Sequence, residues 1–200
     1  MGRKSLIKER KALTPKAETW VRSLFPLLQD RALEKITLDE LASMMGKSKS
    51  TLYTYFETKN EIIEATVYFI LNDIETAILK DFPDTEDMEL AYRFMLLTIS
   101  KSLSGLSIRF LDEIKEHYSN VWEMITKFID RMLITFKNIY KKGMDSGQFN
   151  RFNIDLMMAM DMHFVVEILT DTTRFKNAKL SVNDLVHQYL ELRIKALVKI

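Results

Sequence analysis

Residues 36–62 read ITLDELASMMGKSKSTLYTYFETKNEI, and this stretch decides the fold. It opens with Thr37, and Glu40 follows three residues later, which is the pattern of a helix-capping box. Apolar residues then recur at helical spacing as far as Gly46, and glycine commonly ends a helix. The pattern predicts a short helix after Thr37 and a tight turn at residues 46–48.

A second short helix is predicted after the turn, over residues 49–56, with Ser48 as its N-cap. Leu52 and Phe56 are four residues apart, so they share one helical face and can be buried together. A helix of this length is not stable alone and must be held by its neighbours. Two such helices joined by a tight turn form a helix-turn-helix, which we place at residues 38–56.

The polar side chains left on the surface of this helix-turn-helix suit contact with DNA. The N-terminus of a helix attracts phosphate through its free N–H groups and its dipole. Hydroxyl groups and lysines bond phosphate oxygens or base edges. The side chains expected to face outward are those of Lys49, Ser50, Tyr53, Thr54 and Tyr55. On these residues alone, the alternative is a capped helical hairpin with a merely polar surface.

Charge is distributed unevenly along the chain, although the formal net charge is only +1. Residues 1–60 carry 12 Lys and Arg against seven Asp and Glu, whereas residues 61–200 carry 17 against 21. A basic end on a mildly acidic body indicates that the end meets a polyanion.

The rest of the chain is expected to be helical too. Its 200 residues include only five Gly and three Pro, with many Leu, Ile, Met, Lys and Glu, which favours an all-α fold. Thr14 and Pro15 open the first helix, which Pro26 should kink or shorten. We expect about nine helices in two domains, at residues 1–60 and 61–200. The later helices are predicted at residues 58–80, 85–103, 107–118, 121–145, 154–174 and 182–199.

Composition argues against several functional classes. The chain has no cysteine, which excludes disulfides, thiolate zinc sites and cysteine nucleophiles. Its three histidines, His117, His163 and His187, lack metal-ligand spacing, and no phosphate-binding glycine loop occurs. We therefore expect no enzyme activity, no catalytic residues, no metal and no cofactor. The basic N-terminus is followed by no apolar run of a signal peptide, and charges interrupt the apolar residues 154–169, so we expect a cytoplasmic protein without membrane contact.

Residues 48–59, SKSTLYTYFETK, resemble the DNA-binding domain of the tetracycline-repressor (TetR) family, whose motif is similar to S-K-G-T-L-Y-x-Y-F-x-x-K-x-x-L. Ile62 stands at the final apolar place, and the resemblance covers about residues 14–63. It implies a three-helix DNA-binding domain followed by a variable helical domain that binds ligand and dimerises. Ser50 replaces the family's usual glycine, Ala32 stands where a glycine often ends the first helix, and Pro26 is unusual within that helix.

The resemblance also implies which residues touch DNA. Backbone phosphates would be contacted by Thr37, Ser48, Thr51, Tyr53, Tyr55 and Lys59. The residues nearest the base edges would be Lys49, Ser50, Tyr53 and Thr54, and Lys47 in the turn completes the set of DNA-binding candidates. The expected partner is double-stranded DNA, bound by a homodimer whose recognition helices enter successive major grooves of a palindromic operator. Repression is the commoner mode of regulation in the family.

The C-terminal domain contains candidates for a ligand pocket, because Met and aromatic side chains suit an adaptable apolar cavity. These are Tyr68, Phe94, Met95, Phe110, Trp122, Ile125, Phe128, Met132, Phe136, Met158, Met162 and His163. The expected ligand is apolar or amphipathic, with His163, near Asp161 in the sequence, as a candidate polar contact. The alternative is that these residues fill an ordinary core.

The last two long helices are the expected dimer interface, because a helix that is apolar nearly all round is buried, often against a partner. The candidates are Met157, Met160, Phe164, Val165, Ile168, Leu185, Leu192 and Leu197. Two chains would pair isologously as a four-helix bundle. Two other functions stay open: a helical DNA-binding protein without a small-molecule effector, and a helical interaction module that no longer binds DNA.

Overall fold

The computed structural model describes residues 11–102, 105–170 and 181–199, with the backbone alone at residues 165–170 and 182. These residues are helical apart from turns, loops and an isolated antiparallel bridge between Phe149 and Val198. Each helix expected from the sequence is present, and the first is divided in two. The helices are α1 Pro15–Arg22, α2 Phe25–Leu28, α3 Leu38–Met44, α4 Lys49–Leu52, α5 Lys59–Asp81, α6 Met88–Ser102, α7 Ile108–His117, α8 Ser119–Asp145, α9 Ile154–Thr170 and α11 Val182–Leu197.

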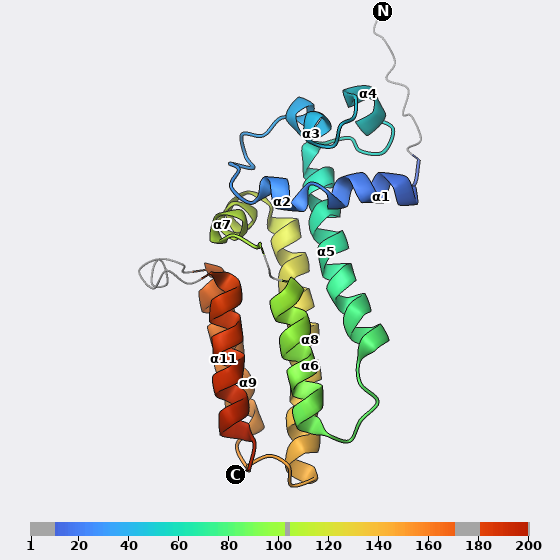
Figure 1. The fold of residues 1–200 in the computed structure, drawn as a ribbon. Coiled ribbons are helices and arrows are strands. Elements are labelled where there is room, and N and C mark those ends of the chain that lie inside the picture. The colour runs from blue at the N-terminus through green and yellow to red at the C-terminus, as the bar shows by residue number, and fades with distance from the viewer. Residues whose placement is uncertain (1–10, 103–104, 171–180, 200) are drawn as a thin grey trace, which may run out of the picture.

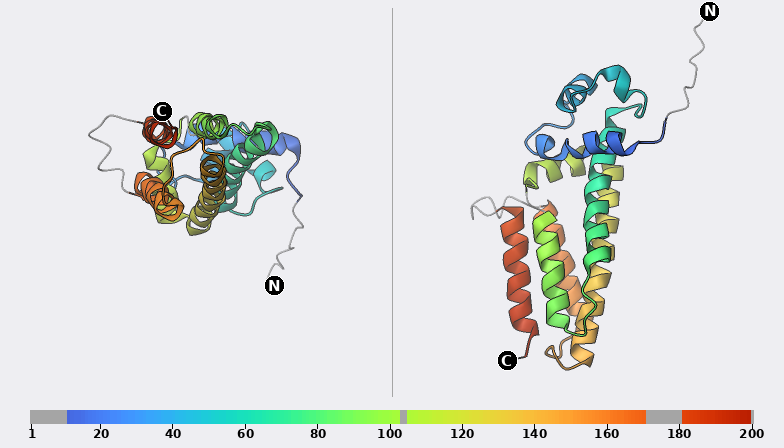
Figure 2. Two further views of the ribbon diagram at one scale, coloured as in Figure 1. Left: turned by 90° about the horizontal axis from the view of Figure 1, so that it is seen from below. Right: turned by 45° about the vertical axis from the view of Figure 1, so that its right-hand side comes forward.

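The helices form a small head on an elongated bundle (Figure 1). Helices α1 to α4 and the first turns of α5 make up the head, and α5 then runs into the bundle beside α6 and α8. Helices α9 and α11 lie along the opposite edge of the bundle, and the short α7 lies crosswise beneath α2 (Figure 2). Among the residues that the structure describes, no helix combines the length and the hydropathy needed to cross a membrane.

Pro26 divides the first helix, as the sequence predicts. α1 ends at Arg22 and α2 begins at Phe25, so Pro26 lies in the first turn of a new helix, where its missing N–H breaks no helical hydrogen bond. The break lets Leu24 and Leu28 both face the core of the head, and both are fully buried.

The predicted start of the helix-turn-helix is confirmed by its hydrogen bonds. The Thr37 hydroxyl accepts a bond from the Glu40 N–H at 3.2 Å, and the Glu40 carboxylate accepts one from the Thr37 N–H at 2.8 Å. Gly46 follows α3 with a φ of 63°, a left-handed conformation that glycine adopts without a steric penalty. These local features fix where α3 begins and where the chain turns toward α4.

The second helix of the motif is shorter than predicted. α4 ends at Leu52, whereas the sequence pattern predicts a helix through Phe56. Beyond Leu52 the chain forms tight turns, in which the N–H groups of Tyr55 and Phe56 both donate to the Leu52 carbonyl, at 2.9 and 2.8 Å. These turns still bury Leu52 and Phe56 in one core, although the two residues no longer lie on one regular helix.

Two large hydrophobic clusters form most of the core among the residues that the structure describes. The first joins the head to α5, α7 and the start of α8, and it includes Leu33 and Phe56. The second lies farther down the bundle between α5, α6, α8 and α11, and it includes Tyr92 and Tyr140. α5 begins beside the predicted domain boundary at residue 60 and contributes to both clusters, and the two-domain division itself stays a prediction.

Lys59, in the first turn of α5, holds the loop that precedes α3. Its ammonium group donates hydrogen bonds to the backbone carbonyls of Leu33, Glu34 and Ile36, at 3.3 Å for Leu33 and 3.2 Å for Ile36. The Leu33 carbonyl also accepts a bond at 3.0 Å from the hydroxyl of Tyr118, directly after α7. Burial raises the pKa of Tyr118, so this hydroxyl keeps the proton that it donates. The loop is therefore fixed from α5 and from α7.

Replacing Lys59 with methionine is expected to lower the free energy of unfolding by about 1–3 kcal/mol, because part-buried carbonyls lose their hydrogen-bond donor. Lys35→Met is the matched control, since it removes the same charge from an exposed lysine in the same loop. Urea denaturation followed by circular dichroism measures both stabilities. If the two variants are equally stable, Lys59 does not have this structural role.

Candidate nucleic-acid interface and internal cavity

The polar candidates on α3 and α4 lie at the end of the head that faces away from the bundle (Figure 1). Thr37, Ser48, Lys49, Ser50 and Tyr53 are all exposed, and Tyr53 leaves 47% of its surface open to solvent. They come from the start of α3, the turn, α4 and its C-cap, and the ion pair between Asp39 and Lys49 brings the starts of α3 and α4 together.

A group of hydroxyls surrounds the start of α4. Ser48 caps the helix by accepting a hydrogen bond from the Thr51 N–H at 3.2 Å. The Ser48 oxygen also lies 2.9 Å from the hydroxyl oxygens of both Ser50 and Thr51. Ser50, which replaces the glycine of the resembling motif, is thus held beside the helix cap and remains exposed. This group offers hydroxyl donors to a phosphate oxygen or a base edge.

Two lysines beside the hydroxyl group contact neighbouring side chains. Lys49 Nζ forms an ion pair with Asp39 of α3 at 2.9 Å, and the hydrogen bond to this carboxylate raises the pKa of Lys49. Both side chains are exposed, so a phosphate can replace the carboxylate at little energetic cost. Lys47 Nζ lies 4.4 Å from the centre of the Trp20 ring, which is a cation–π contact.

The remaining DNA-binding candidates are half-buried. They are Thr51, Thr54, Tyr55 and Lys59. The Tyr55 ring packs edge-on against Trp20 with 6.3 Å between the ring centres, and the Lys59 ammonium group bonds the loop before α3. The Thr54 carbonyl accepts a bond at 3.2 Å from the Lys11 N–H, which places the start of the described chain beside α4.

A cavity of about 180 Å³ lies within the bundle and reaches the underside of the head. Its wall is built by α2, α5, α6, α7, α8, α9 and α11, and its described lining is apolar except for four residues, Ser102, Tyr140, Asp161 and Tyr189. Five of the residues predicted for a ligand pocket line it, namely Phe110, Ile125, Phe128, Met132 and Phe136.

The other predicted pocket residues are absent from the described lining. Tyr68 and His163 are exposed, and Met95 is fully buried in the second hydrophobic cluster. Phe94 instead packs edge-on against Phe82, with 5.7 Å between the ring centres. Phe94 is half-buried, as are the remaining members of the set, Trp122, Met158 and Met162.

Sequence reasoning missed much of the aliphatic lining, including Val67, Ile70, Leu71 and Ile74 on α5. These residues have the spacing of any buried helical face, so no signal in the sequence separates them from core residues. Phe164, predicted for the dimer interface, also lines the cavity, where its ring stacks on Tyr189 with 3.6 Å between the centres.

A buried polar cluster forms part of the cavity wall. Asp161 on α9 accepts hydrogen bonds from the hydroxyls of Tyr140 on α8, at 2.8 Å, and Tyr189 on α11, at 2.6 Å. Arg193, one turn beyond Tyr189, forms an ion pair with Asp161 at 2.7 Å. Burial raises the pKa of both tyrosines and the Asp161 carboxylate raises it further, so both hydroxyls remain protonated donors.

The cavity is in direct contact with the head. Phe25 of α2 and Phe110 of α7 both line it, and their rings meet edge to face with 5.6 Å between the centres. Beside them, the buried Gln29 side chain accepts a bond at 2.7 Å from the Ser107 N–H, and the Gln29 carbonyl accepts one from the Ser107 hydroxyl. These contacts join the start of α7 directly to α2 and the residue that follows it.

The dimer-interface candidates on α9 and α11 differ in exposure. Met160 and Leu192 are 50% and 67% exposed, and Leu156 adds a further exposed apolar side chain on α9. Met157 is half-buried. The candidates Val165 and Ile168 lie outside the residues whose side chains are described.

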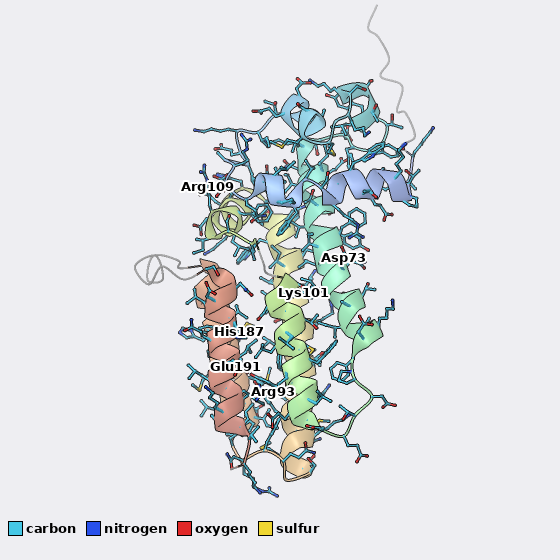
Figure 3. The ribbon with its side chains drawn as sticks, viewed as in Figure 1. Asp73, Arg93, Lys101, Arg109, His187 and Glu191 are labelled. Atoms are coloured by element: carbon cyan, nitrogen blue, oxygen red, sulfur yellow. The ribbon has the colours of Figure 1, made fainter. Side chains whose placement is uncertain are left out.

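Two further candidates on this edge belong to the interior of the protomer. Leu185 and Leu197 are buried, and Leu197 lies in the second hydrophobic cluster. α11 packs against α6, where Arg93 and Glu191 form an ion pair at 3.4 Å (Figure 3). Leu185 and Leu197 are therefore covered within their own protomer.

Comparison with known proteins connects the head to a family. The sequence model of the family described as bacterial regulatory proteins, tetR family, matches residues 25–66. YvaF of Bacillus subtilis (strain 168), an uncharacterized HTH-type transcriptional regulator, is 23% identical over 138 residues, which cover 68% of this chain and 72% of YvaF.

Solved structures share the fold of nearly the whole chain. A putative TetR-family transcriptional regulator from Rhodococcus sp. aligns with a TM-score of 0.72 at 10% identity, covering 93% of this chain and all of that one. The regulator FadR of Bacillus subtilis, solved in complex with stearoyl-CoA, aligns with a TM-score of 0.67 at 15% identity, covering 88% of this chain and 97% of FadR.

The family match begins at α2 and ends within α5, so it covers the whole helix-turn-helix with its caps and its exposed surface. The chain around it has the fold of TetR-family regulators. Over residues 25–66 the sequence is thus similar to the tetR family of bacterial regulatory proteins.

Proposed function

We propose that the protein is a ligand-responsive repressor that acts as a homodimer on a palindromic operator in double-stranded DNA. One observation supports this proposal most strongly: the cavity in the bundle is lined by Phe25 of the head and by Phe110 of α7, whose rings are in contact. The head that contains Phe25 also bears the exposed surface of α3 and α4. A ligand in the cavity would act on the residues that set the position of the head.

DNA contact is assigned to the exposed surface formed by Thr37, Ser48, Lys49, Ser50 and Tyr53, bordered by Lys47, Thr51 and Thr54. α4 would lie in the major groove, and the hydroxyl group at its start would face phosphates and base edges. Lys49 would exchange the Asp39 carboxylate for a phosphate. Tyr55 and Lys59 act as positioning residues in this proposal, because both make their polar or aromatic contacts within the head.

An apolar or amphipathic ligand is supported by the aliphatic and aromatic lining of the cavity. A protein of the same fold, FadR of Bacillus subtilis, was solved with stearoyl-CoA bound. The ligand would favour a conformation in which the two heads of the dimer are spaced differently, so DNA affinity would fall.

A homodimer is supported by the exposed apolar side chains on α9 and α11, which lie along one edge of the bundle (Figure 2). Leu156, Met160 and Leu192 would be covered when the same edge of a second copy packs against them. The pairing would be isologous and would build a four-helix bundle from two helices of each protomer.

Lys49→Ala is expected to weaken binding to the protein's own promoter region and to lower the slope of log Kd against log salt by about one for each phosphate that the lysine neutralises. Asp39→Asn should tighten binding, because it removes the carboxylate that competes for Lys49. Lys80→Ala, at an exposed lysine near the far end of α5, is the control. Fluorescence anisotropy of labelled DNA measures all three, and unchanged binding by the Lys49 and Asp39 variants would contradict the assigned surface.

Met160→Glu combined with Leu192→Glu is expected to convert dimers into monomers, because charges would be buried in an apolar interface. Leu79→Glu is the matched control, since Leu79 is 80% exposed on α5, away from this edge. Sedimentation velocity gives the molecular mass of each variant. A double variant that remains dimeric would rule out this interface.

Gln29→Ala is expected to weaken the coupling between cavity and head, because the Ser107 N–H loses its acceptor at the C-cap of α2. Decan-1-ol, a neutral apolar probe, should lower the DNA affinity of the parent by about 5- to 150-fold, the usual range of allosteric coupling, and the variant's by less. Gln188→Ala, at an exposed glutamine on α11, is the control. Equal DNA release from Gln29→Ala and the parent would show that this contact does not carry the coupling.

A further inference from the structure

The polar cluster in the cavity wall restricts the charge of the molecule that occupies the cavity. Asp161, Tyr140 and Tyr189 come from three different helices and all belong to the described lining. Asp161 is only 5% exposed, although its side chain carries a carboxylate. A ligand that fills the apolar part of the cavity therefore meets a buried carboxylate and two phenolic hydroxyls.

The two carboxylate oxygens of Asp161 differ in their bonding. Oδ1 accepts bonds from the Tyr189 hydroxyl at 2.6 Å, from Arg193 Nε at 3.0 Å and from Arg193 Nη2 at 2.7 Å. Oδ2 accepts one bond from the described residues, which is donated by the Tyr140 hydroxyl at 2.8 Å. Because a carboxylate oxygen has about two lone-pair sites, Oδ2 can accept a further donor.

Arg193 neutralises Asp161 from a position outside the described lining. Its side chain is 12% exposed, and Nη2 also donates to the Met157 carbonyl at 3.3 Å. An anionic ligand would lose its hydration and lie against the Asp161 carboxylate, whose partner guanidinium is already engaged. A cationic ligand would also lose its hydration, and the negative charge of Asp161 that could compensate it is already neutralised by Arg193. A neutral hydroxyl avoids both penalties and fits Oδ2.

We infer that the ligand of this cavity is an uncharged amphipathic molecule, with an apolar body against the aliphatic and aromatic wall and a hydroxyl-type donor bonded to Asp161 Oδ2. This inference rests on the proposed ligand response and further specifies that the ligand is uncharged. Long-chain alcohols have this chemistry, and the ionised fatty acids of equal length do not.

Decan-1-ol and decanoate are matched probes, because they share an alkyl chain and differ in the head group. At pH 8, where decanoate is ionised, the full-length protein is expected to bind decan-1-ol at least about 10-fold more tightly, because decanoate would lose its hydration beside a carboxylate whose guanidinium partner is already engaged. Displacement of an apolar fluorescent dye, with both probes below their aggregation limits, measures the two dissociation constants.

Asp161→Asn tests whether this preference comes from the carboxylate. The substitution preserves the shape of the side chain and leaves the Arg193 guanidinium uncompensated, so decanoate should bind at least as tightly as decan-1-ol. Tyr140→Phe is the control, because it removes a hydroxyl from the same cluster without changing the charge and should keep the preference for the alcohol. Thermal melting shows that each variant is folded, and the comparison in the parent decides the question even if Asp161→Asn does not fold.

The outcomes separate this inference from the proposed function. Tighter binding of decanoate by the parent, or an alcohol preference unchanged in Asp161→Asn, would overturn the assigned charge and leave a ligand response intact. Binding of decan-1-ol with no effect on DNA affinity would contradict the ligand response alone. Binding of neither probe by the parent would contradict both.

Discussion

The Leu33 carbonyl oxygen is the point on which the head of this protein depends. It accepts hydrogen bonds from the Lys59 ammonium group at 3.3 Å and from the Tyr118 hydroxyl at 3.0 Å, so one backbone atom joins the loop before α3 to both α5 and α7. Leaving this part-buried carbonyl without a hydrogen-bond partner would cost free energy, and both hydrogen bonds are electrostatically stronger in the protein interior than in water. With this loop held, the Thr37 capping box starts α3 in a fixed direction, and the exposed surface of α3 and α4 follows from it.

The same region shows what the sequence predicts and what it does not. The capping box at Thr37, the Ser48 cap, the turn at Gly46 and the break at Pro26 were all predicted, because each depends on residues within a few positions of one another. The length of α4 was not, because the turns after Leu52 depend on how Phe56 reaches a core built by distant segments. The carbonyl partners of Lys59 were missed for the same reason, since they lie 23 to 26 positions away in the sequence.

The cavity was harder to predict than the head. Five of the aromatic, aliphatic and methionine candidates line it. Met95 and Tyr68 are also methionine and aromatic candidates, but Met95 is buried in the core and Tyr68 is exposed on the surface. The type of a side chain shows whether it is suited to line a cavity, whereas the packing of the helices decides which residues line it. The sequence offers His163 as a candidate polar contact or a core histidine, but its side chain is exposed, and the buried polar group is Asp161, two positions earlier on α9. Its partners Tyr140, Tyr189 and Arg193 come from α8 and α11, so no local pattern indicates the cluster.

In the proposed mechanism, occupation of the cavity changes the spacing of the two DNA-binding heads of the dimer. The chain has no cysteine, so Lys16→Cys, at an exposed position on α1, gives a single spin-label site on each head of a dimer. Electron–electron double resonance then measures the distance between the two labels in the free dimer, with DNA and with decan-1-ol. We expect a narrow distribution with DNA, at the spacing that places the recognition helices about 34–36 Å apart or somewhat more, and a different mean distance with decan-1-ol. The same distance distribution in the DNA-bound and decan-1-ol-bound states would contradict it.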